Sequence, residues 1–131
     1  MKSVPYASAV GSIMYAQVCT RPNLASATGM LGRYQKNPGI EHWKAVKKTL
    51  RYLQGTKGLM LTYRRSDTLE VVGYSDADWA GCRDTKKSTS GYIYTLAGGA
   101  ISWKSSKMSV VASSTMYAEF VACYEATGQA Q

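Results

Sequence analysis

Three stretches in the first half of the chain carry apolar residues at the spacing of amphipathic helices. The first covers about residues 5–18, where Ser3 can cap the helix and Pro5 suits its first turn. The second begins after Thr20, and the turn at 37–39 ends it because Pro38 cannot continue a helix. The inward faces of these two helices are predicted to be Tyr6, Val10, Ile13, Met14 and Gln17, and then Leu24, Thr28 and Leu31.

The third stretch, about residues 41–54, carries two parallel stripes along one helix. The apolar stripe is Trp43, Val46, Leu50 and Leu53. The basic stripe is Lys44, Lys47, Lys48 and Arg51, about 100° round from the first. One stripe can therefore pack on the other helices while the second faces a phosphate backbone. The alternative is an ordinary amphipathic surface helix, although four like charges on one face repel each other unless something anionic relieves them.

From about residue 58 the pattern changes from helical spacing to alternation. Strands are predicted at 69–76, 90–96 and 100–104, with a Gly98-Gly99 turn and a further extended segment at 109–112. A helix of about 115–127 follows, capped by Ser113 or Ser114. Its buried side is predicted to be Met116, Phe120 and Cys123 or Tyr124. The expected fold class is α+β, a helical module followed by an antiparallel meander and a helix.

Charge is divided unequally between the two halves of the chain. Residues 1–66 hold eleven Lys and Arg against one acid, a net charge of +10, whereas residues 67–131 hold five against seven, a net charge of −2. A basic half suits a polyanion, because each neutralised phosphate releases condensed counterions. The alternative is a solvated surface with no partner.

The cysteines and the apolar runs limit the class of protein. Cys19, Cys82 and Cys123 are odd in number and far apart, and His42 has no second ligand nearby, which excludes a typical zinc site. Reduced thiols that pack as small hydrophobes are expected. No apolar run reaches the roughly 18 residues of a membrane span, and the N-terminus lacks the pattern of a signal peptide. We therefore expect an intracellular protein, cytoplasmic or nuclear, that is neither secreted nor membrane-bound.

Acidic residues at two places are candidates for metal chemistry. Asp76 and Asp78 come at the end of a predicted strand, where alternation places both on one face. Two adjacent carboxylates repel unless a cation lies between them, and Mg²⁺ prefers carboxylate oxygen and water. Glu119 lies on the predicted last helix among apolar neighbours, and packing of that helix on the meander could bring it beside Asp76. The alternative for the two aspartates is that they simply begin a turn. The alternative for Glu119 is that it is a partly exposed acid on a helix.

Two other kinds of chemistry are excluded. The run Lys86-Lys87-Ser88-Thr89 lacks the glycine that a phosphate-binding loop requires before its lysine. The run Ser113-Ser114-Thr115 lacks both the glycine frame of a serine hydrolase and a nearby histidine.

Motifs in both halves resemble one family in its own order. The first half resembles the end of a copia-type retrotransposon reverse transcriptase in VPYASAVGS (4–12), CTRPN (19–23), NPG (37–39), HW (42–43) and LRYLQGT (50–56). The second half resembles the RNase H domain that follows it in YSDADWAG (74–81), KSTSGY (87–92), AISW (100–103) and AEF (118–120). The resemblance covers nearly the whole chain, which makes it more specific than any single motif.

The resemblance implies a role for each half. Residues 1–60 would be the thumb-like or connecting helical region of the reverse transcriptase, which holds the primer–template. Residues 69–131 would be the N-terminal half of an RNase H-like domain, truncated after its first long helix. The implied partners are an RNA–DNA hybrid or other nucleic acid and the rest of the Pol polyprotein.

The same resemblance implies a metal site. In this family four acidic residues bind two Mg²⁺ ions, one of which helps to generate the attacking hydroxide while the other stabilises the leaving oxygen. Asp76 matches the first catalytic aspartate and Glu119 the catalytic glutamate. Asp78 belongs to the motif and is carried over only as an additional candidate.

Two departures from the family pattern bear on activity. Tyr117 stands where the family usually has an acid, and the remaining strands, helices and two further acids of the pattern would follow Gln131. The chain is therefore expected to be a fragment with little or no nuclease activity of its own. The alternatives are a non-enzymatic nucleic-acid-binding remnant of a degenerate retroelement and an inert product of a decayed reading frame.

Overall fold

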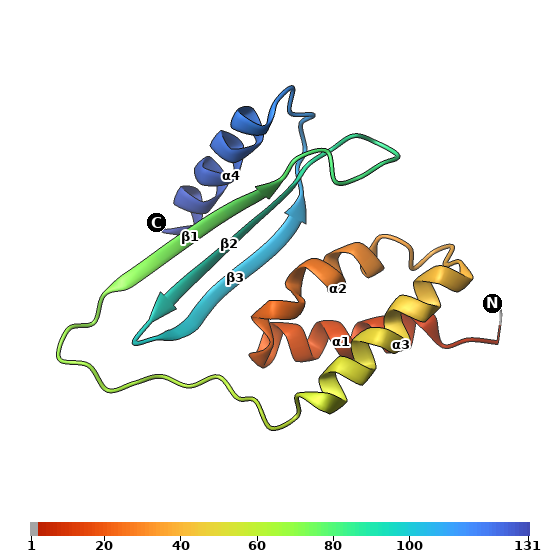
Figure 1. Cartoon of the computed structure of the whole chain (residues 1–131), viewed down its shortest axis with the longest axis horizontal. Helices are drawn as coiled ribbons and strands as arrows, with labels where there is room; N and C mark the ends of the chain where they lie inside the picture. Colours follow the sequence, from red (N-terminus) through yellow and green to blue (C-terminus); the bar gives the residue numbers. More distant parts are fainter. Residues whose placement is uncertain (1–2) are drawn as a thin grey trace. The chain divides into compact units, whose positions relative to one another are not determined.

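The structure, a computed structural model, describes residues 3–131 and divides into two compact units, Met1–Leu61 and Thr62–Gln131. Within the described residues the first unit holds three α-helices, and the second holds a three-stranded antiparallel sheet and a fourth α-helix (Figure 1). The predicted α+β class is confirmed. Each unit has its own core of buried apolar residues.

The helices of the first unit are α1 (Tyr6–Thr20), α2 (Ala25–Gly32) and α3 (Ile40–Gly55), with a short 3₁₀ helix, η1 (Pro22–Leu24), before α2. Their buried core is Tyr6, Val10, Ile13, Leu24, Leu31 and Val46. The Tyr6 hydroxyl donates a 2.9 Å hydrogen bond to the Leu31 carbonyl, which fastens α1 to α2. The three helices predicted from apolar spacing are confirmed.

Three details of the helical prediction are wrong. The N-cap of α1 is Pro5 with no side-chain cap, so Ser3 does not serve there. Met14 and Leu50 lie at the edges of their helices and stay 40% and 39% exposed, because the small core is filled by their neighbours. Helix α2 ends at Gly32, before the predicted Pro38 stop, and Tyr34 beyond it stacks on His42 with ring centroids 3.9 Å apart.

The sheet of the second unit has the order β1-β2-β3 and consists of β1 (Val71–Asp78), β2 (Thr89–Leu96) and β3 (Gly99–Lys107). Both pairs are antiparallel, and the register aligns Ala77 with Ser90 and Ser90 with Ser106. Directly opposite residues point to the same face of a sheet, so these three side chains lie together. The predicted meander is confirmed, but residues 109–112 form no strand.

The hairpin between β2 and β3 turns one residue earlier than predicted. Its two turn residues are Ala97 and Gly98, with φ angles of 53° and 79°, as a two-residue turn of type I′ requires. Gly99 instead begins β3, where an added Cβ would lie 2.6 Å from the Thr62 carbonyl oxygen. Close approach of the chain at residues 62–63 therefore explains the second glycine of the pair.

Helix α4 (Thr115–Gln129) packs on β1 and β2. The Ser114 hydroxyl caps it by accepting the Tyr117 N–H at 3.2 Å, which confirms one of the two predicted caps. Its buried residues are Ala118, Ala122 and Ala126, so the predicted buried side of Met116, Phe120 and Cys123 or Tyr124 is wrong. Small side chains bring the helix close enough to the sheet for the Tyr94 hydroxyl to donate a 2.5 Å hydrogen bond to the Ala126 carbonyl.

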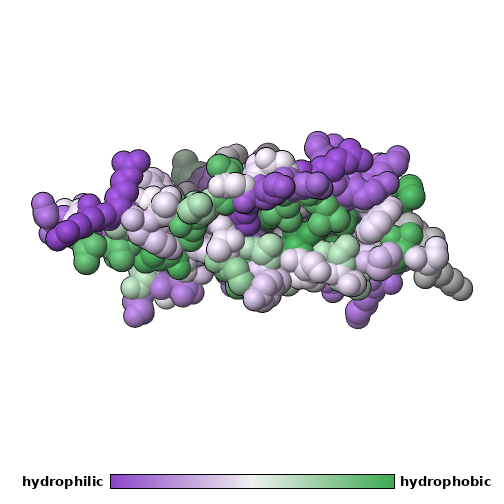
Figure 2. Space-filling view, turned by 90° about the horizontal axis from the view of Figure 1, so that it is seen from below, coloured by the Kyte–Doolittle hydropathy of each residue, from purple (hydrophilic) through white to green (hydrophobic). Residues whose placement is uncertain are grey.

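Large apolar side chains remain at the surface of both units, and Figure 2 shows apolar patches between polar ones on the face in view. Cys19 and Cys123 are exposed rather than packed as small hydrophobes, and Cys82 is partly exposed. Among residues 3–131 no helix is both long enough and apolar enough to cross a membrane.

Candidate functional site

The end of β1 determines which way its two aspartates point. Ala77, between them, packs against the buried cluster that contains Ala118 and Ala122 of α4. Because successive side chains of a strand point to opposite faces, Asp76 and Asp78 lie together on the face that α4 does not cover. Both are exposed, and one Asp76 carboxylate oxygen accepts the Ala77 N–H at 2.9 Å.

The Asp78 carboxylate is folded back onto the loop that follows β1. A Cβ added at Gly81 would overlap this carboxylate, at 2.9 Å from its Cγ and closer still to one oxygen. A side chain at position 81 would therefore displace the carboxylate. This contact gives a physical reason for glycine three residues after the second aspartate.

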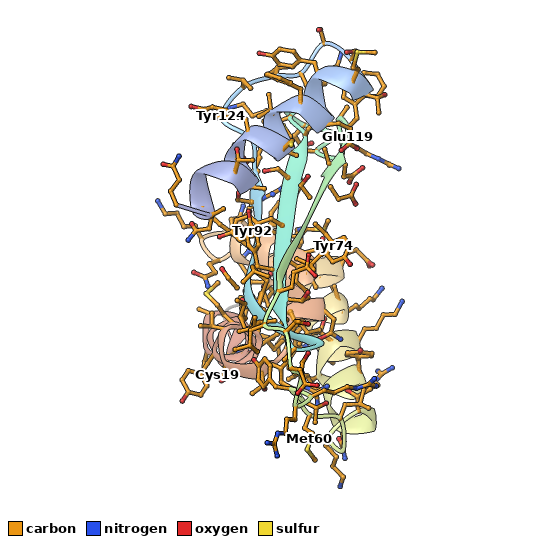
Figure 3. All side chains as sticks on the ribbon, turned by 90° about the vertical axis from the view of Figure 1, so that its left-hand side faces the viewer. Cys19, Met60, Tyr74, Tyr92, Glu119 and Tyr124 are labelled. Atoms are coloured by element: carbon orange, nitrogen blue, oxygen red, sulfur yellow. The ribbon has the colours of Figure 1, made fainter. Side chains whose placement is uncertain are left out.

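Glu119 is exposed and lies on the N-terminal half of α4, as Figure 3 shows. The helix packs on β1, where Ala77 lies against the buried cluster that contains Ala118 and Ala122. Among residues 3–131, no three His, Cys, Asp or Glu side chains gather closely enough to hold a metal ion. The shared metal site of Asp76 and Glu119 therefore stays a prediction.

Hydrogen bonds that the sequence did not reveal tie the end of β1 to the segment leading into α4. The Trp79 indole N–H donates to the Ala112 carbonyl at 3.2 Å. The buried Ser88 hydroxyl accepts the Ala80 N–H at 3.0 Å, and the Ser88 carbonyl accepts the Met108 N–H at 2.9 Å. These bonds fix the elements that carry the candidate acids relative to each other. The only sequence signal for them was the position of Trp79 and Ser88 within the two recognised motifs.

Cys82 has an unusual environment in the same loop. Hydrogen bonds from the side chain and backbone of Thr85, with smaller contributions from Lys107 and the backbone of Asp84, lower the pKa of its thiol from 9.0 to about 7. Hydrogen bonding to the charged form of an acid favours that form. A substantial fraction of Cys82 is therefore thiolate at neutral pH, a property that no sequence pattern indicated.

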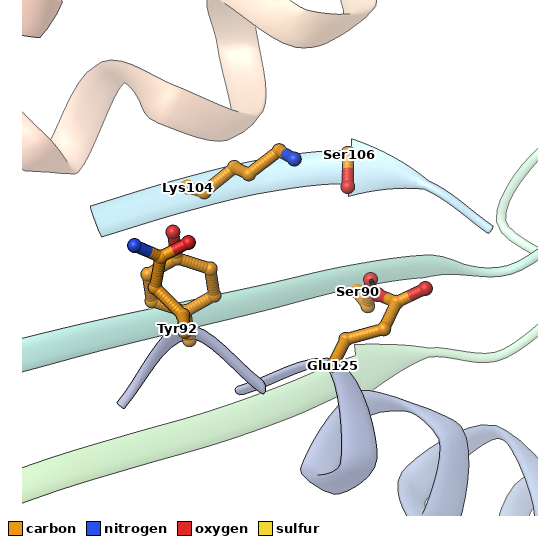
Figure 4. A pocket seen from close by; sticks show the side chains of 6 residues that line it. Ser90, Tyr92, Lys104, Ser106 and Glu125 are labelled. Atoms are coloured by element: carbon orange, nitrogen blue, oxygen red, sulfur yellow. Dashed lines mark hydrogen bonds between the residues drawn. The ribbon is translucent and has the colours of Figure 1, made fainter. Parts of the chain in front are cut away.

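A polar pocket of about 260 Å³ lies on the other face of the sheet, beside the C-terminal half of α4 (Figure 4). Its lining side chains are Ser90, Tyr92, Lys104, Ser106, Glu125 and Gln129. The Ser90 hydroxyl donates a short hydrogen bond to the Glu125 carboxylate, which fastens α4 to β2. Since Asp76 and Asp78 point to the opposite face, this pocket is separate from the predicted metal site.

The four residues of the predicted basic stripe, Lys44, Lys47, Lys48 and Arg51, are all exposed on α3. Lys44 forms a 2.6 Å ion pair with Glu41, which is the one ion pair within residues 3–131. The like-charge repulsion expected along the stripe is therefore relieved at its N-terminal end. Lys47, Lys48 and Arg51 remain as the free cationic surface.

Arg21 joins two of the recognised motifs. Its guanidinium donates to the hydroxyl of Thr56 at 3.2 Å and to the carbonyl of Thr56 at 2.6 Å, at the C-terminal end of α3. The Asn23 amide beside it donates a 2.5 Å hydrogen bond to the Tyr52 hydroxyl. The positive guanidinium also complements the negative end of the helix dipole. Arg21 is thus a structural residue of the first unit, not a free phosphate ligand.

Comparison with known proteins gives three informative relatives. The retrovirus-related Pol polyprotein from transposon TNT 1-94 of Nicotiana tabacum is 54% identical over 125 residues, which are 95% of this chain and 9% of that protein. The Pol polyprotein from transposon RE2 of Arabidopsis thaliana is 43% identical over 115 residues, 88% of this chain and 8% of that protein. Secreted RxLR effector protein 161 of Plasmopara viticola is 51% identical over 130 residues, 99% of this chain and 92% of that protein. No protein-family model and no solved structure matches.

The chain belongs to the family of copia-type retrotransposon Pol polyproteins. It spans less than a tenth of the length of the two Pol relatives described above. The expectation of an intracellular, non-secreted protein is contradicted, because the Plasmopara viticola relative, similar over nearly the whole chain, is named as a secreted protein. The expectation came from the absence of a signal-peptide pattern and from sparse cysteines, and neither feature determines where a protein is delivered.

Proposed function

We propose that the chain is the stretch of a Pol polyprotein where the end of the reverse transcriptase, residues 1–60, meets the first half of an RNase H-like domain, residues 69–131. One observation carries this proposal. Asp76 and Asp78 lie side by side at the end of the first strand of an antiparallel meander, and the following helix packs on that strand. The Pol relatives support the same reading, and the rest of the polyprotein is the natural partner.

The parent protein, on this proposal, degrades the RNA strand of RNA–DNA hybrids, with Asp76 and Glu119 as metal ligands and Asp78 beside them. Two carboxylates on one sheet face and a third on α4 do not make a site for two Mg²⁺ ions within residues 3–131. Mg²⁺ needs close to ideal octahedral geometry, which scattered ligands do not supply. We therefore propose that this chain alone has little or no nuclease activity.

Incubation of the chain with Mg²⁺ and a labelled RNA–DNA hybrid tests this proposal. We expect little or no cleavage above a control without protein. Robust cleavage that disappears in Asp76→Asn would show that the site is complete in this chain. Robust cleavage that survives Asp76→Asn would show that the assignment of Asp76 is wrong.

Metal binding can be measured even without activity. We expect Mn²⁺, a paramagnetic substitute for Mg²⁺, to broaden the backbone NMR signals of Asp76 and Glu119 together, with one shared midpoint in the millimolar range. Asp76→Asn should weaken both effects, and Asp67→Asn, which removes an exposed acid outside the site, should leave them unchanged. Broadening at Asp76 without any at Glu119 would show that the two acids do not share an ion.

The exposed basic stripe of α3 favours a second function, non-enzymatic binding of nucleic acid. Lys47, Lys48 and Arg51 lie on one helix face, and residues 1–66 carry a net charge of +10. Cations at helical spacing can contact successive phosphates of one backbone, and this binding is independent of sequence. The function requires no metal site, so it stands even if the nuclease assignment fails.

A pair of triple variants isolates the stripe from the overall charge. We expect Lys47→Gln, Lys48→Gln and Arg51→Gln together to weaken binding to a duplex at least tenfold. The matched control is Arg83→Gln, Lys86→Gln and Lys104→Gln, which removes the same number of exposed charges from the second unit. Equal losses in the two variants would attribute the binding to net charge and not to α3.

A further inference from the structure

The floor of the polar pocket consists of two pairs of residues on neighbouring strands. Ser90 of β2 lies directly opposite Ser106 of β3, and Tyr92 lies directly opposite Lys104. Directly opposite residues point to the same face of a sheet, as do residues two apart on one strand, so the four side chains lie together. This is the face on which α4 packs, because the Ser90 hydroxyl donates a hydrogen bond to the Glu125 carboxylate.

Helix α4 forms one wall of the pocket and leaves the floor open over β3. The helix packs on β1 and β2, and its residues Glu125 and Gln129 are one turn apart, so both face the pocket. Figure 4 shows Glu125 beside Ser90, and Lys104 extending along β3 toward Ser106. The side chains that β3 contributes are a lysine and a serine, so this part of the sheet suits a polar ligand better than an apolar covering layer.

Two opposite charges line the pocket without neutralising each other. Within residues 3–131 the one ion pair joins Glu41 and Lys44, so the Lys104 ammonium and the Glu125 carboxylate are not paired with each other. The Glu125 carboxylate accepts the bond from Ser90, and the Lys104 side chain is exposed. The pocket therefore presents a cation and an anion that are held apart on β3 and α4.

This pair of charges discriminates between classes of ligand. A simple anion such as phosphate is attracted by Lys104 and repelled by Glu125, and a simple cation experiences the reverse. A metal ion requires several oxygen ligands, and no group of three metal-binding side chains is found within residues 3–131. A neutral molecule would displace water from both charges without replacing it by an opposite charge. A ligand with one positive and one negative group satisfies both side chains.

We propose that the pocket binds a small zwitterion of the α-amino-acid class, with the ligand carboxylate at Lys104 and the ligand ammonium at Glu125. The hydroxyls of Ser106 and Tyr92 can donate further hydrogen bonds to the carboxylate. A volume of about 260 Å³ is below the roughly 300–1,000 Å³ of sites for drug-sized ligands, so the ligand is small. The proposal does not rest on either proposed function, because the pocket lies on the face of the sheet opposite the aspartates of β1.

NMR titration of the full chain with L-phenylalanine tests the proposal, since the probe's ring can also pack on Tyr92. We expect the amide signals of Ser90, Ser106 and Gln129 to shift with one shared midpoint in the millimolar range. Three analogues separate the charges: 3-phenylpropionate lacks the ammonium, 2-phenylethylamine lacks the carboxylate, and N-acetylphenylalanine amide lacks both. Each single-charge analogue should bind about two- to fivefold more weakly than L-phenylalanine, because it loses one partly exposed ion pair. The uncharged analogue should bind least.

Two variants assign the charges to their side chains. Lys104→Gln should weaken binding of L-phenylalanine and 3-phenylpropionate about two- to fivefold, and should not weaken binding of 2-phenylethylamine. Glu125→Gln should weaken L-phenylalanine and 2-phenylethylamine instead, and its amide oxygen can still accept the Ser90 bond. The matched controls are Lys86→Gln and Glu70→Gln, which remove exposed charges of the same unit outside the pocket and should bind like the unchanged chain. The amide spectra verify that all four variants fold.

Three results would overturn the proposal. The first is the absence of shifts at the pocket residues up to the solubility limit of L-phenylalanine. The second is equal binding of L-phenylalanine and either single-charge analogue, which would mean that the pocket does not recognise both charges. The third is an equal loss of binding in the pocket variants and in their matched controls, which would attribute the effect to net charge.

Discussion

At the scale of single residues, a few side chains fix positions that the sequence leaves open. Tyr94 crosses the sheet face beneath α4 and donates to the Ala126 carbonyl, and Gly73 on β1 leaves room for its ring. Arg21 and Thr56 meet across 35 positions of sequence. No local pattern predicts such pairs, because their partners become neighbours only when the chain folds.

Gly73 is predicted to be intolerant of any side chain. A Cβ at this position would lie 2.9 Å from Cδ1 of Tyr94 and closer still to Cε1, so the ring and its hydrogen bond must shift. We expect Gly73→Ala to lower the free energy of unfolding by about 1–3 kcal/mol, as measured by urea denaturation. Gly128→Ala is the control, since nothing lies within 4 Å of an added Cβ there. It should be neutral or stabilising by up to about 1 kcal/mol.

Ala97 is predicted to be a site for stabilisation. Its φ of 53° is in the left-handed region, which costs an alanine roughly 1–2 kcal/mol. Asn adopts this conformation more readily, and Asn-Gly is the preferred pair in a type I′ hairpin. We expect Ala97→Asn to raise the free energy of unfolding by about 0.5–1 kcal/mol, which a shift in the denaturation midpoint would report. A decrease would show that the turn is not of type I′.

At the scale of elements, the sequence predicted the class and order of helices and strands but not which faces they bury. Alternation placed Asp76 and Asp78 on one face of β1, as the structure has them. It could not say that α4 covers the opposite face, because that depends on how the chain crosses over after β3. For α4 itself, apolarity favoured Phe120 and Tyr124 as core, whereas closeness to the sheet selected the smaller alanines. Helix α4, whose largest apolar side chains are exposed, is therefore the element whose buried face was hardest to predict from the sequence.

The loop between β1 and β2 gives a prediction that depends on pH. The pKa of Cys82 is lowered to about 7 by hydrogen bonds from Thr85 first and Lys107 to a lesser degree. The thiolate is the reactive form, so alkylation of Cys82 should rise as pH increases through about 7. We expect Thr85→Val to move that midpoint upward, because it removes a bond to the charged form. Mass spectrometry of iodoacetamide-treated chain resolves the three cysteines, and an unchanged midpoint in Thr85→Val would contradict the assigned cause.

At the scale of the whole molecule, the excess positive charge and the candidate acids lie in different parts of the chain. The cationic residues follow the helical unit, and the candidate acids follow the sheet unit. This division could be predicted from the sequence, because it requires only a count of the charged residues in each half. Whether Asp76, Asp78 and Glu119 share one metal ion could not be determined from the sequence, because it depends on side-chain directions at a junction of two elements.

The salt dependence of nucleic-acid binding should report the number of phosphate contacts. For duplex DNA the logarithm of the binding constant falls with the logarithm of salt concentration by about 0.9 per phosphate neutralised. Loss of Lys47, Lys48 and Arg51 should therefore reduce the slope by roughly 2–3. Fluorescence anisotropy between low and moderate salt measures it. A slope that stays the same in this variant would show that the stripe does not contact the backbone.

The bonds of Arg21 have a consequence for a sequence that accumulates mutations. One bond goes to the Thr56 hydroxyl and the other to its main-chain carbonyl. Every residue that replaces Thr56 still presents the carbonyl, so one of the two anchors survives any exchange at that position. Replacement of Arg21 by an apolar residue removes both at once. In a copy that is not under selection, a mutation of Arg21 would therefore remove both bonds to the end of α3, whereas a mutation of Thr56 would remove only the bond to its hydroxyl.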